Sequence, residues 1–432
     1  MNFKNKIIGI FLFLSINALA QTGNIREVTV KGLGLNRDGA LQDAFRNAIS
    51  SAAGVALTAE TRMENFMVVE DAVQTKASGY INKYNVINEG KSADGVWVEI
   101  SASVSLDPLK ADVALLGKAI GGVRFMVAYD PNVKRQERDL YDFAIERINQ
   151  ALSERKYRYI EKSRFDELRN EASNIGETYR DSSNEISYVQ QLGMRAGAQF
   201  MIYIKNISTQ SRSEAFDTRS SSKVTMAVKA YDNCTAEGLG TILLESKFIS
   251  GREGDAALKQ GIQEAIAQDI DKLLGVFATY IGDWANNGTP FEFRFYQSGT
   301  FRDFRDLRGK LKSDPKFGGD FEVVSTENYT KINCTYKEVP DEIAYKVLDY
   351  ADEVATFKAL KLDVKYMFGR QINFAPSSVK IASPQASSIL TTPTENKPPA
   401  NESKPNTEPA TKKPSSTNKK VPTSRSGAKK TK

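Results

Sequence analysis

A run of small side chains with one large apolar residue per turn constrains the fold of this chain more than any other feature. Between positions 40 and 52 the apolar residues recur every three or four positions, which is the spacing of one face of an α-helix. They are Ala40, Leu41, Ala44, Phe45, Ala48, Ile49 and Ala52. A face made mostly of alanine lets a helix lie close against a β-sheet. We predict a strand at 27–31 before this helix and Gly54 as its C-terminal cap.

The residues that follow complete a small α+β domain, which we place at 24–107. The helical spacing returns over Asn65–Tyr80. Apolar and polar residues then alternate over Tyr84–Ile87 and Val96–Val104, as in strands with one buried face. We therefore expect a small αβ domain in which the alanine-rich helix lies against a sheet.

Three ordered segments of this domain resemble a known family. "GLGLNRDGALQDAFRNAISSAAG", "SGYINKYNVI" and "GVWVEISASVSL" are similar to the amino-terminal domain of the flagellar assembly T-like proteins. The resemblance covers roughly a fifth of the chain. It implies a small periplasmic αβ module without enzymatic activity, and it does not make this a flagellar protein.

The first twenty residues have the pattern of a secretion signal. Lys4 and Lys6 precede the apolar run Ile7–Ile16, and the triplet 18–20 fits a signal-peptidase site. The apolar run is short for a membrane anchor, and no cysteine stands at the cleavage site for a lipid anchor. We expect cleavage after Ala20, a mature chain that begins at Gln21, and a periplasmic location without a transmembrane segment.

Positive charge is concentrated at the end of the chain. The formal net charge is +6, but from Val379 onward eleven Lys or Arg face three Glu, a net charge of +8. Without this tail and the two lysines of the signal segment, the folded part carries about −4. A mildly acidic body argues against a nucleic-acid platform.

A second, middle domain is predicted at 121–287. Its first elements alternate as strand, helix, strand, helix and strand, which implies parallel strand pairing through crossover connections. The second helix is predicted to begin at Ser163, with Ser163 and Asp166 as its capping residues. The three strands are Val123–Tyr129, Tyr157–Glu161 and Ala198–Ile204. An antiparallel pair and a long core-covering helix follow, at Val224–Tyr231, Thr241–Phe248 and Leu258–Ile281.

This middle domain also resembles known proteins. "YRYIEKSRFDELRNE" and "LGMRAGAQFMIYIKNI" are similar to the αβ domain of the curli secretion-channel protein, the amino-terminal domain of the Tol translocation protein and the middle domain of the flagellar T protein. In those families the first segment is architectural. This chain departs from them by a polar insertion at Asn174–Ser183 and by Ser208–Ser222, which we interpret as a loop. It has no amphipathic hairpins of a membrane-inserting kind, which argues against a pore.

A third domain is predicted at 289–374 with the ferredoxin-like order βαββαβ. Its predicted elements are an alternating strand with Phe291, Phe293 and Phe295, a helix over Phe301–Leu311, a hairpin of Phe321–Ser325 and Lys331–Tyr336, a helix from Pro340, and a strand at Leu360–Met367. From 375 to 432 Pro, Ser, Thr, Asn and Lys dominate, which predicts a disordered tail.

The absence of histidine removes several chemistries at once. Without it there is no Ser-His-Asp or Cys-His nucleophile and no histidine-bearing zinc site. Cys234 and Cys334 fall in different predicted domains, so we favour two unpaired thiols, although an exported protein can keep a disulfide.

Carboxylates remain as candidate catalytic groups. Glu70, Asp71, Asp303 and Asp306 lie on helices whose other face is apolar, so we interpret them as solvated surface groups. Gly32–Gly34 lacks the rest of a phosphate loop, and the aspartates of 130–142 do not have calcium-loop spacing. We assign no catalytic, cofactor-binding or metal-binding residue, and no cofactor.

These observations predict a non-enzymatic, exported cell-envelope protein that assembles or stabilises other envelope proteins through protein–protein contacts. The alternatives are a carboxylate-dependent periplasmic hydrolase and a soluble ring-forming relative of the curli secretion protein. The basic tail, with Lys412, Lys413, Lys419 and Lys420, is interpreted first as solubilising. Contact with anionic envelope polymers is the second interpretation, and nucleic acid is the least favoured partner.

Overall fold

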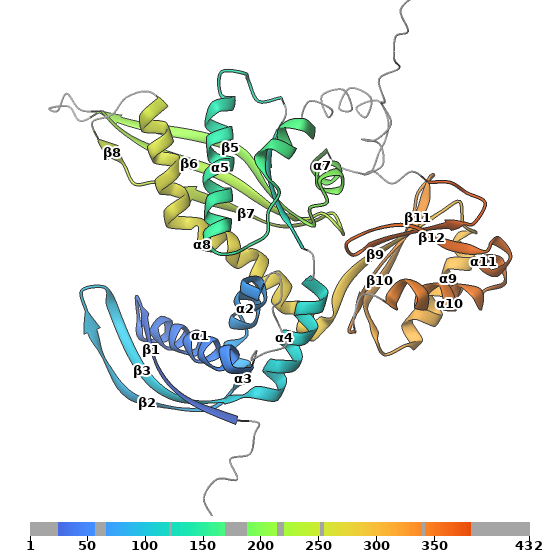
Figure 1. Ribbon diagram of the computed structural model, residues 1–432, viewed down its shortest axis with the longest axis horizontal. Coiled ribbons are helices and arrows are strands. Elements are labelled where there is room, and N and C mark those ends of the chain that lie inside the picture. Colours follow the sequence, from blue (N-terminus) through green and yellow to red (C-terminus); the bar gives the residue numbers. More distant parts are fainter. Residues whose placement is uncertain are drawn as a thin grey trace, which may run out of the picture. The chain divides into compact units, whose positions relative to one another are not determined.

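The computed structural model describes residues 25–56, 66–120, 123–130, 132–168, 188–213, 220–250, 255–338 and 342–381 (Figure 1). Helices and three separate sheets make up a multidomain α+β chain, which confirms the predicted fold class. The signal segment 1–20, the insertion at 174–183 and residues 382–432 of the tail lie outside the described residues. Within the described residues, no helix is both long and apolar enough to cross a bilayer.

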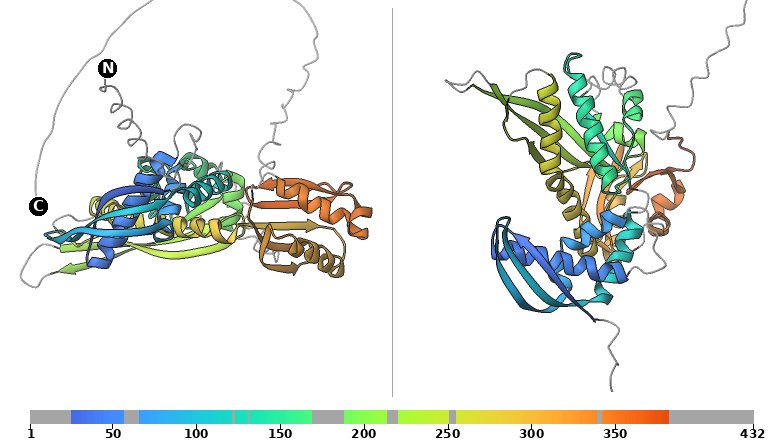
Figure 2. Two further views of the ribbon diagram at one scale, coloured as in Figure 1. Left: turned by 90° about the horizontal axis from the view of Figure 1, so that it is seen from below. Right: turned by 60° about the vertical axis from the view of Figure 1, so that its left-hand side comes forward.

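The first sheet has three antiparallel strands in the order β1-β3-β2, and α1 lies along one of its faces (Figure 2). Their bounds are β1 Ile25–Gly34, β2 Ile81–Ser92, β3 Gly95–Ser105 and α1 Arg37–Ala56. The alanines of the predicted stripe and Ile49 are fully buried, and Phe45 is almost so. A side chain at Gly32 would run into the backbone of Ala40 and Ala44, so strand and helix are in close contact.

Two boundaries in this region differ from the prediction. α1 continues through Gly54 to Ala56, so Gly54 is not its cap. The predicted helix 65–80 is two helices, α2 (Phe66–Gln74) and α3 (Ala77–Tyr80). They separate at Thr75, whose hydroxyl donates to Ala72 O (2.7 Å) and so supports a turn there. α4 (Leu106–Ile120) follows the sheet.

The middle sheet is mixed, as predicted. Its order is β4-β5-β6-β7, with β4 and β5 parallel and the other pairs antiparallel. A short strand, β8, also pairs with β6. The bounds are β4 Phe125–Tyr129, β5 Phe200–Ser213, β6 Ser220–Asp232, β7 Glu237–Glu245 and β8 Ile249–Ser250. The helices are α5 Arg138–Glu154, α7 Tyr188–Ala196 and α8 Asp255–Asn287.

Two predicted features of the middle domain are absent from its described residues. The predicted strand 157–161 makes only one bridge, between Tyr159 and Phe125, because the chain turns into a helix from position 162. Ser163 therefore lies inside that helix instead of capping it. Asp166 pairs with Lys162 (2.7 Å) one turn earlier.

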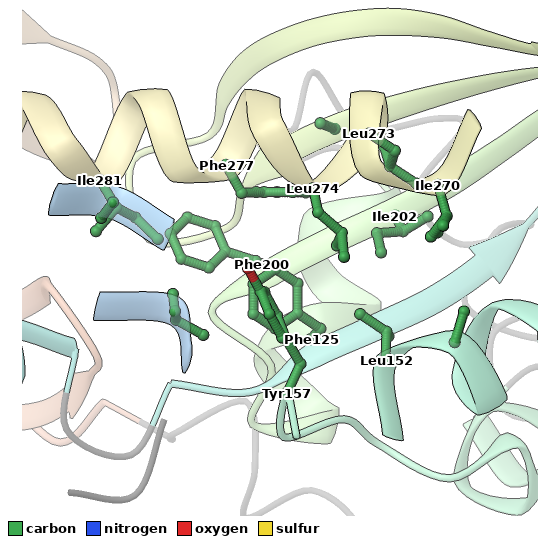
Figure 3. Close-up of a cluster of buried hydrophobic side chains, with 14 of the residues drawn as sticks. Phe125, Leu152, Tyr157, Phe200, Ile202, Ile270, Leu273, Leu274, Phe277 and Ile281 are labelled. Carbon is green, nitrogen blue, oxygen red and sulfur yellow. The ribbon is translucent and has the colours of Figure 1, made fainter. Parts of the chain in front are cut away.

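One continuous apolar cluster connects the first two predicted domains. It runs from Val28 to Trp284, and Leu274, Phe277 and Ile281 of α8 point into it (Figure 3). Phe277 of α8 packs edge-on against Phe125 of β4, with ring centroids 5.1 Å apart. A Cβ on Gly282 of α8 would lie 2.8 Å from Ala72 O of α2. The long helix therefore packs on the middle sheet and on the first domain at once.

The third sheet has the order β10-β11-β9-β13-β12. The bounds are β9 Thr289–Tyr296, β10 Phe317–Ser325, β11 Tyr329–Tyr336, β12 Leu362–Phe368 and β13 Gln371–Pro376. Helices α9 Phe301–Ser313, α10 Ile343–Asp352 and α11 Ala355–Leu360 accompany it. The split unit β9-α9-β10-β11 is as predicted. The extra strand β13 pairs parallel with β9 and carries the fold to Pro376, past the predicted boundary at 374.

Candidate interaction site

Strands β5 and β6 extend far beyond the rest of the middle sheet. β5 has 14 residues and β6 has 13, and their antiparallel register continues to the pair Ser213–Ser220. The prediction of a loop at 208–222 is therefore wrong for 208–213 and 220–222, while 214–219 lie outside the described residues. Threonine is common in strands, and a full ladder of backbone hydrogen bonds holds this polar segment extended.

Among the described residues, no strand pairs with the outer edge of β5 beyond Ile204. β4 pairs with β5 only from Phe200 to Ile204, and no described strand continues on that side. The backbone N–H of Ile207 points away from β6 and donates to the Tyr141 hydroxyl (3.2 Å). Since alternate residues of an antiparallel strand direct their backbone groups outward, Thr209, Ser211 and Ser213 follow Ile207 in doing so.

Side chains or irregular register steps interrupt parts of five other edge strands in the described part of the chain. On β1, Asp43 accepts from Leu33 N (2.9 Å) and the Asn47 amide donates to Lys31 O (2.8 Å). On β7, Asp269 accepts from Glu245 N (3.0 Å). Strands β2, β10 and β12 carry irregular register steps. Such devices hinder pairing with a foreign strand. β5 has an irregular register step of its own between Ile204 and Asn206, and no further one is described from Thr209 to Ser213.

A buried charged cluster lies where β6 ends. Asp232 is fully buried, and its Oδ1 accepts from Arg370 Nη2 (2.8 Å) and its Oδ2 from the Tyr280 hydroxyl (2.7 Å). The Arg370 guanidinium stacks over the Trp284 indole, 4.4 Å from its centroid. Burial is the largest single influence on the pKa of Arg370 and lowers it, but the charge and hydrogen bond of Asp232, together with Cys234 and Tyr280, raise that pKa overall. Burial and Asp232 both raise the pKa of Tyr280.

A second buried charged group lies on the helix-free face of the third sheet. Glu292 accepts from Arg294 (2.5 Å to Nη2) and from the Gln371 amide (2.9 Å). Arg294 also stacks over Tyr329. Neither cluster was predicted from the sequence. No local sequence pattern reports that the charges are buried.

The cavity that best fits the hydrolase alternative is open and exposed. It has a volume of about 670 Å³, and its lining includes Glu237, Asp320 and Glu322. All three acidic residues are exposed to solvent. A general acid that works near neutral pH is usually a buried carboxyl group or one beside a like charge, and this cavity provides no burial for its three carboxylates. Over the described residues, no group of three or more acidic or cysteine side chains could hold a metal ion.

The structure does not bring the predicted candidate carboxylates together in one site. Glu70 and Asp71 belong to α2, whereas Asp303 and Asp306 belong to α9. Asp71 is not a solvated surface group, because it is partly buried and accepts a hydrogen bond from the Tyr157 hydroxyl. Burial is the main cause that raises its pKa, and the Tyr157 bond opposes it.

The other candidates have structural positions. Asp303 forms a capping box with Thr300, and Asp306 is exposed beside Arg305. Asp142, the last residue of the 130–142 segment, forms an ion pair with Lys162 (3.6 Å). Cys234 and Cys334 are buried and unpaired, as predicted. Burial raises the pKa of the Cys234 thiol to about 12, so it is protonated at neutral pH.

Comparison with known proteins adds little to this geometry. No protein-family model matches the chain, and no curated protein matches it either. Among solved structures, it is similar to the hypothetical protein CT253 from Chlamydia trachomatis. The sequence identity is 13%, and the match covers 38% of this chain and 98% of that one, with a TM-score of 0.21.

Proposed function

We propose that this protein is a non-enzymatic, exported component of the cell envelope that assembles or stabilises other envelope proteins by direct contact. The observation that carries the proposal is the outer edge of β5 from Thr209 to Ser213, which no described strand covers, whereas side chains or register steps interrupt parts of other edge strands. The export pattern of the first twenty residues supports the envelope location.

The partner would bind as an added strand. In this mode the main chain of an extended segment forms hydrogen bonds with an exposed sheet edge, which provides affinity for many sequences. Ser208, Thr209 and Gln210 are exposed and small or polar. They therefore present little steric or charge barrier to an incoming strand.

Substitution of Thr209 by proline tests this mode. Proline removes the outward N–H that a partner strand would use, whereas the bonds from β5 to β6 involve the neighbouring residues. Thr209→Val is the matched control because it keeps the N–H and changes only the side chain. Tagged wild type, T209P and T209V would be crosslinked mildly in cells of the source organism and purified from the envelope fraction.

We expect the same envelope proteins with wild type and T209V, and a loss of at least about tenfold with T209P. Circular dichroism and thermal unfolding of the three purified proteins show whether each is folded. Equal recovery with folded T209P would contradict binding at this edge. Recovery no greater than with an empty tag would contradict a scaffold function altogether.

The hydrolase alternative depends on the cavity that contains Asp320 and Glu322. If the protein acts as a scaffold, the double variant D320N/E322Q should recover the same envelope proteins as wild type. It should also restore a strain that lacks the gene as well as wild type does. If D320N/E322Q recovers the envelope proteins but does not restore the strain that lacks the gene, the hydrolase alternative is favoured.

A further inference from the structure

The third sheet has its own core and little apolar contact with the rest of the described chain. Its buried cluster, from Phe291 to Phe374, is separate from the one that ends at Trp284. The apolar cluster that bridges the two has three buried members, Met194, Cys234 and Phe368. Such a small apolar contact is typical of domain interfaces that open.

A single arginine occupies the centre of this junction. Arg370 lies in the turn between β12 and β13, and its side chain is 4% exposed. It forms the ion pair with Asp232 and stacks on Trp284, and both partners belong to the middle domain. On its own side, Nη1 donates to Pro290 O (3.2 Å), and its carbonyl accepts from Glu292 N (3.0 Å). It therefore connects the base of β9 to the end of β6.

The turn itself fits tightly against the middle domain. Gly369 has a φ of +53°, and a Cβ at this position would lie 2.7 Å from Cys234 Sγ and 2.9 Å from Gln199 Cγ. The Gln371 amide reaches Cys234 O at 3.5 Å. Cys234 thus lies directly beneath the turn that carries Arg370, and it is fully buried.

We propose that Arg370 is a latch that docks the third sheet onto the middle domain, and that its release frees this sheet as an intact module and uncovers Cys234. Removing one partner of this buried ion pair leaves the other with its hydrogen bonds but without its opposite charge, and this disfavours the docked state. Both domains keep their own apolar cores when the latch opens. The connection through Gly288, between α8 and β9, remains covalent.

The two cysteines make a direct test possible, because the chain has no others. In a Cys334→Ala background, Cys234 is the only thiol, and its reaction with 5,5′-dithiobis(2-nitrobenzoate) at pH 8 reports exposure of the junction. In R370A and D232N, we expect Cys234 to react at least about 100-fold faster than in the background protein. The reason is that each substitution removes one member of the buried ion pair and so disfavours the docked state. R302A is the matched control, because Arg302 is exposed on α9, and its rate should not change.

A second single-cysteine background distinguishes release of the third sheet from unfolding of that sheet. Cys334 lies in the core of the third sheet, so with Cys234→Ala it reports that core alone. We expect R370A to leave Cys334 as protected as before. If Cys234 stays equally protected in R370A and D232N, Arg370 is not a latch. If Cys334 reacts faster in step with Cys234, Arg370 maintains the fold of the third sheet, and the proposal is wrong.

Discussion

Asp71 shows how partial burial of a carboxylate makes the stability of the protein depend on pH. Its pKa is raised, mainly by burial, so the folded protein holds this proton more tightly than the unfolded chain does. Stability therefore falls as pH rises from about 4, the ordinary value, through the raised folded pKa.

We expect Asp71→Asn to raise the free energy of unfolding at pH 7 by roughly 1 kcal/mol, because the amide keeps an acceptor for the Tyr157 hydroxyl and removes a partly buried charge. At pH 3.5 the two proteins should differ little, since the aspartate is then protonated. Denaturant unfolding at both pH values measures this. A variant that is less stable than wild type at pH 7 would show that the charged bond to Tyr157 outweighs the burial.

Asp303 and Asp306 have similar positions in the sequence and different environments. Asp303 accepts from Thr300 N (2.7 Å) and from the Thr356 hydroxyl (2.8 Å), and the Thr300 N–H is the largest cause that lowers its pKa. Asp303→Ala should cost about 0.5–2 kcal/mol at pH 7, as for other lost helix caps. Because the folded pKa is lowered, this contribution is present above about pH 4 and is lost as pH falls through the lowered value.

The exposed Asp306 is the control for this prediction. Asp306→Ala should change the free energy of unfolding by less than about 0.5 kcal/mol. Denaturant titrations at pH 7 and pH 3 compare the two variants with wild type. Equal effects of both substitutions at pH 7 would contradict the capping role of Asp303.

At the scale of elements, the sequence predicts the helices and strands whose apolar residues recur at regular spacing along one face. The spacing of Ala40, Ala44 and Ala48 predicted α1 correctly because all three side chains are buried on one face of the helix. The outer halves of β5 and β6 escaped prediction because residues such as Ser208 and Gln210 are exposed, so no buried face imposes an alternation. The cluster of Asp232 and Arg370 escaped prediction because its members are 138 residues apart and meet only through the fold.

The contact between α8 and α2 provides a test with a matched control inside one helix. A Cβ on Gly282 would lie 2.6 Å from the Thr75 hydroxyl and 2.8 Å from Ala72 O, whereas a Cβ on Gly275 would meet nothing within 4 Å. We expect Gly282→Ala to destabilise the protein by about 1–3 kcal/mol, through overpacking. Gly275→Ala should be neutral or stabilise by up to about 1 kcal/mol, through helix propensity. Thermal unfolding of both variants decides, and equal melting temperatures would mean that α2 and α8 are not closely packed.

At the scale of the whole molecule, we expect the basic tail and the folded body to act separately. Since the last described strand ends at Pro376 and Val379 N donates to Pro376 O (2.9 Å), a truncation should begin after residue 381. Removing 382–432 should leave the unfolding temperature unchanged, because a polar, lysine-rich segment adds little to a core. It should also abolish any salt-sensitive retention of the full chain on peptidoglycan.

Sedimentation with purified peptidoglycan at low and high salt measures this retention, and the full chain is the control. Equal binding by the truncated protein would place the polymer contact in the folded domains. A lowered unfolding temperature would show that the tail contributes to the fold.

The open edge of β5 is the centre of this account, and amide hydrogen exchange tests it most directly. In the protein alone, the outward amides of Thr209 and Ser211 should exchange rapidly, while those of Ser208 and Gln210, which face β6, should be protected. With the envelope partner recovered by the wild-type protein, we predict that Thr209 and Ser211 become protected and that Ser208 and Gln210 change little. Protection of Thr209 and Ser211 in the protein alone, or their unchanged rapid exchange in the complex, would contradict strand addition at this edge.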